Sequence, residues 1–101
     1  MIDWTTAHQI ATAHAATMPM AEPGDRAVVD DRLTVAYDFG WKFVFQSSWY
    51  LQTGDARWRL LNNHPFLVDI REGRVFPLQL PEREATLQRF QQAWNQGLPF
   101  S

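Results

Sequence analysis

The chain has 101 residues, a formal net charge of −2 and 46% hydrophobic residues, including five tryptophans. This composition excludes a disordered chain, and the length is typical of one domain. The weak negative charge argues against a nucleic-acid-binding face, which would be basic.

The first predicted element is an amphipathic helix near the N-terminus. Asp3 is suited to cap it, and apolar residues then recur at helical spacing from Trp4 to Met18, until Pro19 ends the pattern. The stretch is rich in alanine and has few large side chains, so we expect it to pack on a sheet. Residues 21–26 (AEPGDR) are typical of a loop.

Extended segments are predicted next. Residues 27–29 and 33–37 each favour a short strand, and the Asp-Asp-Arg sequence between them is either a turn or a bulge. The clearest pattern is GWKFVFQSSWYLQ, residues 40–52, in which aromatic and polar side chains alternate. It predicts one long strand with a buried aromatic face. Because strands usually run about 3–10 residues, we expect a bend or a bulge near Ser47 and Ser48.

A β-hairpin is predicted between residues 66 and 80. Its loop could contain two residues or three. A three-residue loop at 71–73, with Gly73 in the left-handed conformation, would pair Val68 with Phe76 and give one continuous apolar face. The two-residue loop would not, so we favour the longer one.

The last predicted element is a helix that begins near Pro81 and turns Leu87, Phe90 and Trp94 inward. The expected fold class is therefore α+β. An N-terminal helix is followed by an antiparallel meander of about three to five strands and by a C-terminal helix packed on the sheet, in two layers. We expect residues 1–101 to form one such domain.

The sequence contains none of the common catalytic or metal-binding motifs, such as Gly-x-Ser-x-Gly, a phosphate-binding glycine loop or His-Glu-x-x-His. His8 and His14 would lie on different faces of the first helix, and His64 lies in a turn. Asp30 and Asp31 are neighbours, whose side chains point opposite ways on an extended chain. We therefore expect no enzyme, cofactor or metal.

Two groups of residues are candidates for binding a protein partner. Residues 1–38 carry a net charge of −4 and the remainder +2, so an acidic segment could meet a basic partner surface. Alternatively, these acids form a solvated edge that deters strand pairing. The second group combines a tryptophan with arginines, the residue types enriched at binding hot spots. The candidates are Glu22, Asp25, Asp30, Asp31, Asp38, Arg57, Trp58 and Arg59.

Several short motifs occur together. Gly40-Trp41 opens an aromatic strand that continues into Gln46-Ser47-Ser48, and Asn63-x-Pro65 leads into Phe66-Leu67-Val68-Asp69 and the hairpin glycine. In this order and spacing, over roughly residues 28–96, the chain resembles the YrhB-type domain, which is also immunity protein family 35 of bacterial polymorphic toxin systems.

The resemblance implies a small α+β protein that binds a cognate toxin, expected to be the C-terminal domain of a secreted effector, and blocks its active cleft. A cytoplasmic location agrees with the absence of cysteine and of a secretory signal. The alternatives are a chaperone-like or regulatory binding protein of the same fold, and a small ligand-binding domain or enzyme. The motif residues implied to be structural are Gly40, Trp41, Asn63, Pro65 and Gly73.

Overall fold

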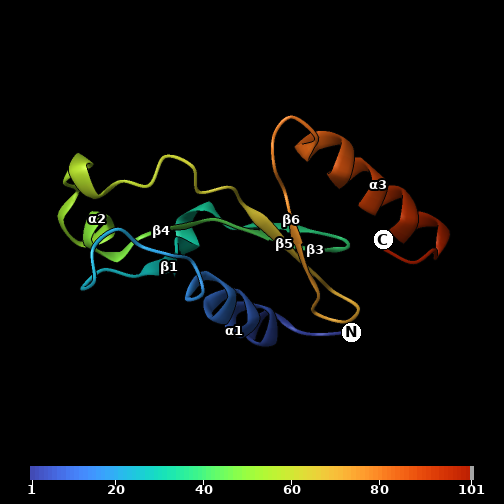
Figure 1. The fold of residues 1–101 in the computed structure, drawn as a ribbon. Helices are drawn as coiled ribbons and strands as arrows, with labels where there is room; N and C mark the ends of the chain where they lie inside the picture. The colour runs from blue at the N-terminus through green and yellow to red at the C-terminus, as the bar shows by residue number, and fades with distance from the viewer. Residues whose placement is uncertain (101) are drawn as a thin grey trace.

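The structure, a computed structural model, describes residues 1–100 as an elongated molecule in which strands run between two long helices (Figure 1). These residues confirm the predicted α+β class. The elements in chain order are α1 (Trp4–Ala15), β1 (Ala27–Val29), the 3-10 turn η1 (Asp31–Leu33), β2 (Val35–Tyr37), β3 (Gly40–Phe43), β4 (Phe45–Ser47), α2 (Ser48–Thr53), the 3-10 turn η2 (Ala56–Trp58), β5 (Phe66–Asp69), β6 (Val75–Pro77) and α3 (Arg83–Gln96).

The strands pair antiparallel in two sheets. The larger sheet has the order β2-β3-β5-β6, and the smaller sheet pairs β1 with β4. The Asp-Asp-Arg sequence, left open as a turn or a bulge, lies between the sheets: Asp30 caps the 3-10 turn η1, which leads the chain from β1 into β2. It is therefore a turn.

The larger sheet is covered on both faces, so the molecule has three layers rather than the two expected from the sequence. Phe66 and Val68 of β5 pack in one cluster with α1, whereas Leu67 belongs to a second cluster with Leu87 and Phe90 of α3. Figure 1 shows the two helices on opposite sides of the strands. The reason lies in β5, whose first three residues are all apolar, a pattern typical of a strand buried on both faces.

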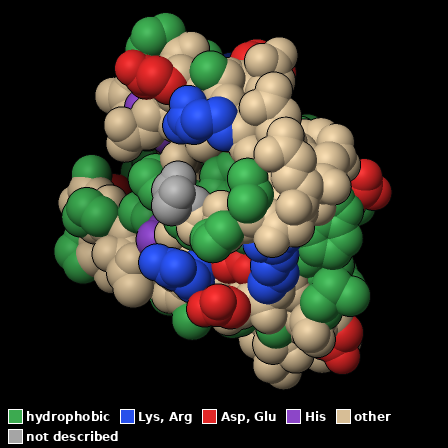
Figure 2. Space-filling model, turned by 90° about the vertical axis from the view of Figure 1, so that its right-hand side faces the viewer, with side chains coloured by type: hydrophobic (Ala, Val, Ile, Leu, Met, Phe, Trp, Pro, Cys, Tyr) green, Lys and Arg blue, Asp and Glu red, His purple; other side chains and the backbone are tan. Residues whose placement is uncertain are grey.

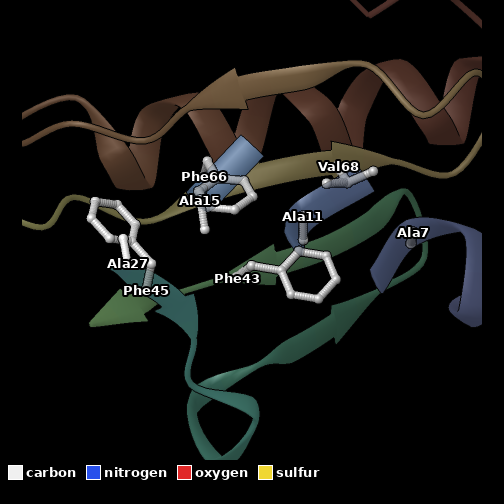
Figure 3. Packing of buried hydrophobic residues seen from close by; sticks show 8 residues of the cluster. All are labelled: Ala7, Ala11, Ala15, Ala27, Phe43, Phe45, Phe66 and Val68. Atoms are coloured by element: carbon white, nitrogen blue, oxygen red, sulfur yellow. The ribbon is translucent and has the colours of Figure 1, made fainter. Parts of the chain in front are cut away.

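The α1 side of the core joins small helix residues to large rings. Ala7, Ala11 and Ala15 are fully buried, and they face the rings of Phe43 and Phe66 (Figure 3). Alanine side chains allow the helix backbone to approach the sheet closely, so the rings fill the remaining space. As predicted, the alanine-rich helix packs on a sheet, and the Asp3 carboxylate caps it by accepting a 2.8 Å hydrogen bond from the N–H of Thr6.

The long strand predicted for residues 40–52 is wrong. Pairing is interrupted at Val44, and after Ser47 the chain turns into the short helix α2. The Ser47 hydroxyl oxygen caps this helix by accepting a 3.2 Å hydrogen bond from the N–H of Tyr50, and Gly54, at φ +70°, ends it. A serine cap and a left-handed glycine are strong helix boundaries, and here they outweigh the alternating pattern.

The predicted hairpin register is also wrong. Val68 pairs with Val75 rather than with Phe76, and Leu67 pairs with Phe76. The loop is therefore one residue longer than predicted, although Gly73 is left-handed as expected, with φ +72°. With this register, Phe66 faces α1 and Phe76 faces α3.

The Asp69 carboxylate explains the longer loop. This side chain is 1% exposed and accepts hydrogen bonds from the backbone N–H groups of Arg71 at 2.9 Å, Glu72 at 2.8 Å and Arg74 at 2.7 Å. A carboxylate that binds the backbone just after it in sequence substitutes for a tight backbone turn. Asp69 thus sets both the loop length and the register.

Candidate partner-binding site

Asp25, one of the acidic candidates, is used inside the chain. Its carboxylate accepts hydrogen bonds from the Ser47 hydroxyl, from the Ser48 hydroxyl at 2.7 Å and from the N–H of Trp49 at 3.2 Å. These contacts fix the loop before β1 to the start of α2. Burial raises the pKa of Asp25, but the two hydroxyls and the N–H groups of Trp49 and Arg26 outweigh it, so the pKa lies below its ordinary value.

Asp25 is expected to make the free energy of unfolding depend on pH. Because its pKa is lower in the folded chain than in the unfolded one, its stabilisation is fully present above about pH 4 and is lost as the pH falls through the folded-state value. Urea denaturation should show that Asp25→Asn is less stable than the natural chain near neutral pH, with a difference that shrinks as the pH falls below the ordinary pKa of an aspartate.

The matched control for that measurement is Glu22→Gln, because Glu22 is an exposed acid of the same loop. Its substitution should leave the free energy of unfolding nearly unchanged at every pH. A difference between Asp25→Asn and the natural chain that stayed constant throughout acidification would contradict the assigned role of Asp25.

The Asp30 carboxylate is likewise bound within the chain, by Arg32. Asp30 is 6% exposed, and its carboxylate oxygens accept hydrogen bonds from Arg32 Nε and Nη2, each at 3.0 Å. The hydrogen bonds from the Arg32 side chain lower the pKa of Asp30 against the opposing effect of burial. Asp30 N–H also donates to the carbonyl of Val44 at 2.8 Å, which ties η1 to the junction of β3 and β4.

The remaining acidic candidates do not gather on one face. Asp31 Oδ1 lies 2.7 Å from His8 Nε2 of α1, whereas Asp38 Oδ2 accepts a 3.4 Å hydrogen bond from Gln91 of α3. These two helices cover opposite faces of the sheet, and Glu22 lies exposed in the loop after α1. The acid excess is therefore distributed around the molecule.

Arg57 and Trp58 form a corner with α2. The Trp58 ring packs edge-on against Trp49 with ring centroids 4.8 Å apart, and the Arg57 guanidinium lies 4.8 Å from the centre of the Trp58 ring. Arg57 Nε also donates to Asp55 at 2.9 Å. These contacts hold η2 against α2, so both side chains have a structural use. Arg59 takes part in no ion pair among residues 1–100.

The structure brings one residue of each candidate group together. Asp30 and Arg59 line the same surface hollow, of about 280 Å³, between η1 and residues 59–63. We call it the Asp30–Arg59 hollow. Arg32 and Leu33 stand on the η1 side, and Leu61 on the opposite side.

Two side-chain amides hold the second wall of the hollow in place. Gln46, only 8% exposed, accepts the N–H of Leu60 at 2.7 Å and donates to the carbonyl of Leu60 at 3.5 Å. Asn63 Nδ2 donates to the carbonyl of Phe45 at 2.7 Å. Residues 59–63 are thus bound to the outer edge of β4 by side chains that replace a neighbouring strand. The site is preorganised.

The rim of the hollow is apolar and exposed. Leu33 is 52% exposed and Leu61 is 81% exposed. A single exposed leucine is ordinary on a protein surface, but these two flank one hollow that also contains Arg32, Arg59 and Tyr50. Tyrosine and arginine beside apolar side chains are typical of binding hot spots. The sequence prediction missed the leucines, because nothing in their local pattern distinguishes them from core residues.

The motif residues lie in the framework rather than on the exposed rim. Gly40 and Trp41 belong to β3, Pro65 is buried before β5, and Asn63 anchors the wall of the hollow. Trp41 is only half-buried and packs edge-on against Trp4. Gly73 contacts α1, where a Cβ would lie 2.6 Å from Ile10 Cδ1.

The opposite end of the molecule, which carries both termini, has a mixed surface. Figure 2 shows acidic, basic and hydrophobic side chains interspersed there, with no continuous field of one charge. Arg71 belongs to this end and is used internally: its Nη1 donates to the carbonyl of Leu98 at 2.5 Å, and its guanidinium lies 4.1 Å from the centre of the Phe100 ring. The Asp30–Arg59 hollow is therefore the stronger candidate for a binding site.

Residues 1–100 also contain a hollow lined by histidines. His14 and His64 line a separate surface hollow with mainly apolar neighbours. In the described part of the chain no three His, Asp or Glu side chains are grouped to hold a metal ion. None of its helices has both the length and the apolar character needed to cross a membrane.

Comparison with known proteins shows one family match. Residues 6–97 match the model of the family described as Immunity protein 35. The chain is also similar to the uncharacterized protein YrhB of Escherichia coli (strain K12), with 41% identity over 39 residues. That segment is 39% of this chain and 42% of YrhB, so it spans less than half of either protein. No solved structure matches the chain.

Proposed function

The chain belongs to the immunity protein 35 family, and from this premise we propose that it binds a cognate bacterial toxin domain and neutralises it. The observation that carries the proposal is the family match, which covers nearly the whole chain from residue 6 to residue 97. The partner is the C-terminal domain of a secreted effector, and the complex forms in the cytoplasm of the producing cell. The chain acts as a binding protein without catalysis.

The toxin docks on the Asp30–Arg59 hollow and its rim. This surface supplies exposed apolar side chains in Leu33 and Leu61 together with arginine and tyrosine donors. Its walls are held by the contacts of Asp30, Gln46 and Asn63, so little conformational entropy is lost when the partner binds. Docked in this way, the chain covers the toxin's active cleft and excludes its substrate.

Affinity capture tests the function. Tagged chain is recovered from lysate of its native cell, co-purified proteins are identified, and the dominant partner is produced as an isolated domain. We expect this domain to form a one-to-one complex with the chain, measured by size-exclusion chromatography with light scattering. A scatter of many abundant proteins, without a stoichiometric complex, would instead support a chaperone-like role and contradict the proposal.

Leu61→Asp is expected to weaken binding of the captured domain by about thirtyfold or more, because it places a charge on the apolar rim that the toxin covers. Leu61 is 81% exposed, so the fold should survive the change. Isothermal titration calorimetry measures the effect. The control is Leu80→Asp, an exposed leucine outside the hollow, which should bind like the natural chain. Equal affinities for the two variants would place the interface elsewhere.

A further inference from the structure

We propose that the Asp30–Arg59 hollow receives an aspartate or glutamate side chain of the toxin, carried on an apolar segment. The inference rests on the proposed function for the identity of the partner. It assigns the chemistry that the partner presents, and it reverses the sign of charge that the acidic segment suggested. The proposal rests on two hydrogen-bond donors that line the hollow, the Arg59 guanidinium and the Tyr50 hydroxyl.

The unused polar groups are hydrogen-bond donors. Arg59 is exposed and pairs with no acid among residues 1–100. The Tyr50 hydroxyl, which also lines the hollow, takes part in none of the hydrogen bonds found within residues 1–100. The carboxylate of the hollow, Asp30, already has both oxygens bound by Arg32. An incoming group must therefore accept hydrogen bonds and carry negative charge, which a carboxylate does best beside arginine.

The exposed apolar rim of the hollow favours a protein side chain over a small ligand. Leu33 and Leu61 stand exposed on its two sides, and a free phosphate or a bare anion would leave them in water. A protein segment with apolar residues beside the acid covers the leucines and reaches the donors at once.

The acidic segment does not cancel this positive site. Asp25 and Asp30 are bound by neighbouring hydroxyl, N–H and guanidinium groups, and Asp31 and Asp38 lie toward the two opposite helices. Arg59 lies instead in the part of the chain that carries a net charge of +2. Complementary charge at such a site guides association and selects the partner more than it adds affinity.

Nuclear magnetic resonance titration tests the inference on the hollow itself. The isotope-labelled full chain is titrated with the capped peptide Gly-Leu-Glu-Leu-Gly, with the same peptide carrying lysine in place of glutamate, and with inorganic phosphate. The glutamate peptide is expected to shift the resonances of Leu33, Tyr50, Arg59 and Leu61, whereas the lysine peptide is not. Raising the salt concentration should weaken the shifts, because an exposed ion pair is screened.

Two variants test whether Arg59 itself binds the glutamate side chain. Arg59→Gln should weaken binding of the glutamate peptide by about fivefold, the size expected for a solvent-exposed ion pair. Arg57→Gln is the matched control, because Arg57 pairs with Asp55 outside the hollow, and it should change the affinity less than about twofold. Equal binding of the lysine peptide, equal shifts with phosphate alone, shifts elsewhere on the chain or no binding would each overturn the inference.

A negative peptide titration would not count against the proposed immunity function. The peptides report on the hollow without any toxin, so their failure leaves a toxin complex at another surface intact. Conversely, a captured toxin domain that binds Arg59→Gln as tightly as the natural chain would remove the carboxylate inference while keeping the immunity role.

Discussion

Gly40→Ala is expected to lower the free energy of unfolding by about 3 kcal/mol or more, because two backbone constraints meet at this residue. Gly40 has φ +154°, a conformation that side-chain-bearing residues rarely adopt. A Cβ would lie 2.2 Å from the carbonyl oxygen of Val68 and 3.0 Å from Cα of Asp69. Both contacts are with the backbone of β5, so relief would require the central strand pair to separate.

Urea denaturation measures this loss, and Gly54→Ala provides the matched control. Gly54 has φ +70°, but a Cβ there would have no heavy atom within 4 Å. The control therefore isolates the conformational cost, about 1–2 kcal/mol. Similar losses for the two variants would show that Gly40 does not stand against β5, and the close pairing of β3 with β5 would be wrong.

Asp69→Ala is expected to cost about 3–5 kcal/mol in the free energy of unfolding. The substitution removes one carboxylate that binds three backbone N–H groups in a site only 1% exposed. Each hydrogen bond to a charged group contributes roughly 1.5–3 kcal/mol, and the loop can recover part of the loss by binding water. Asp69→Asn should lose less stability than Asp69→Ala, because the amide keeps one oxygen that can accept these hydrogen bonds.

The control for Asp69 is Asp55→Ala. Asp55 also caps a turn, accepting the N–H of Arg57 at 3.1 Å, but its side chain is 39% exposed. Its loss should cost less than about 1 kcal/mol, since water replaces the carboxylate at an exposed site. If the two substitutions had equal effects in urea denaturation, Asp69 would not set the hairpin loop.

The elements that the sequence predicted correctly are those whose signals are local. The Asp3 cap, the alanine face of α1 and the left-handed Gly73 each depend on neighbouring residues, and the α+β class follows from them. The predictions that failed depended on distant contacts or on side-chain chemistry. Helix α2 was missed although its Ser47 cap and Gly54 end are local, because the alternating pattern of residues 40–52 favoured a strand and the contact of Ser47 with the distant Asp25 is visible only in the structure.

The candidate site was predicted only in part, for the same reason. Residue type identified Asp30 and Arg59 as candidates, but the sequence could not show that they share a hollow or that Arg32 occupies Asp30. Leu33 and Leu61 carry no local signal of exposure. Gln46 gave no hint either, because the alternating pattern assigned it to the exposed polar face and its burial is visible only in the structure.

Co-expression tests the central claim most directly. The toxin domain recovered by capture is expressed in a sensitive bacterial strain, alone or with this chain, and growth is followed over time. We expect growth arrest by the toxin alone and restored growth with the chain, together with loss of protection for Leu61→Asp but not for Leu80→Asp. Growth arrest that persists while the folded chain is present in excess would contradict the account.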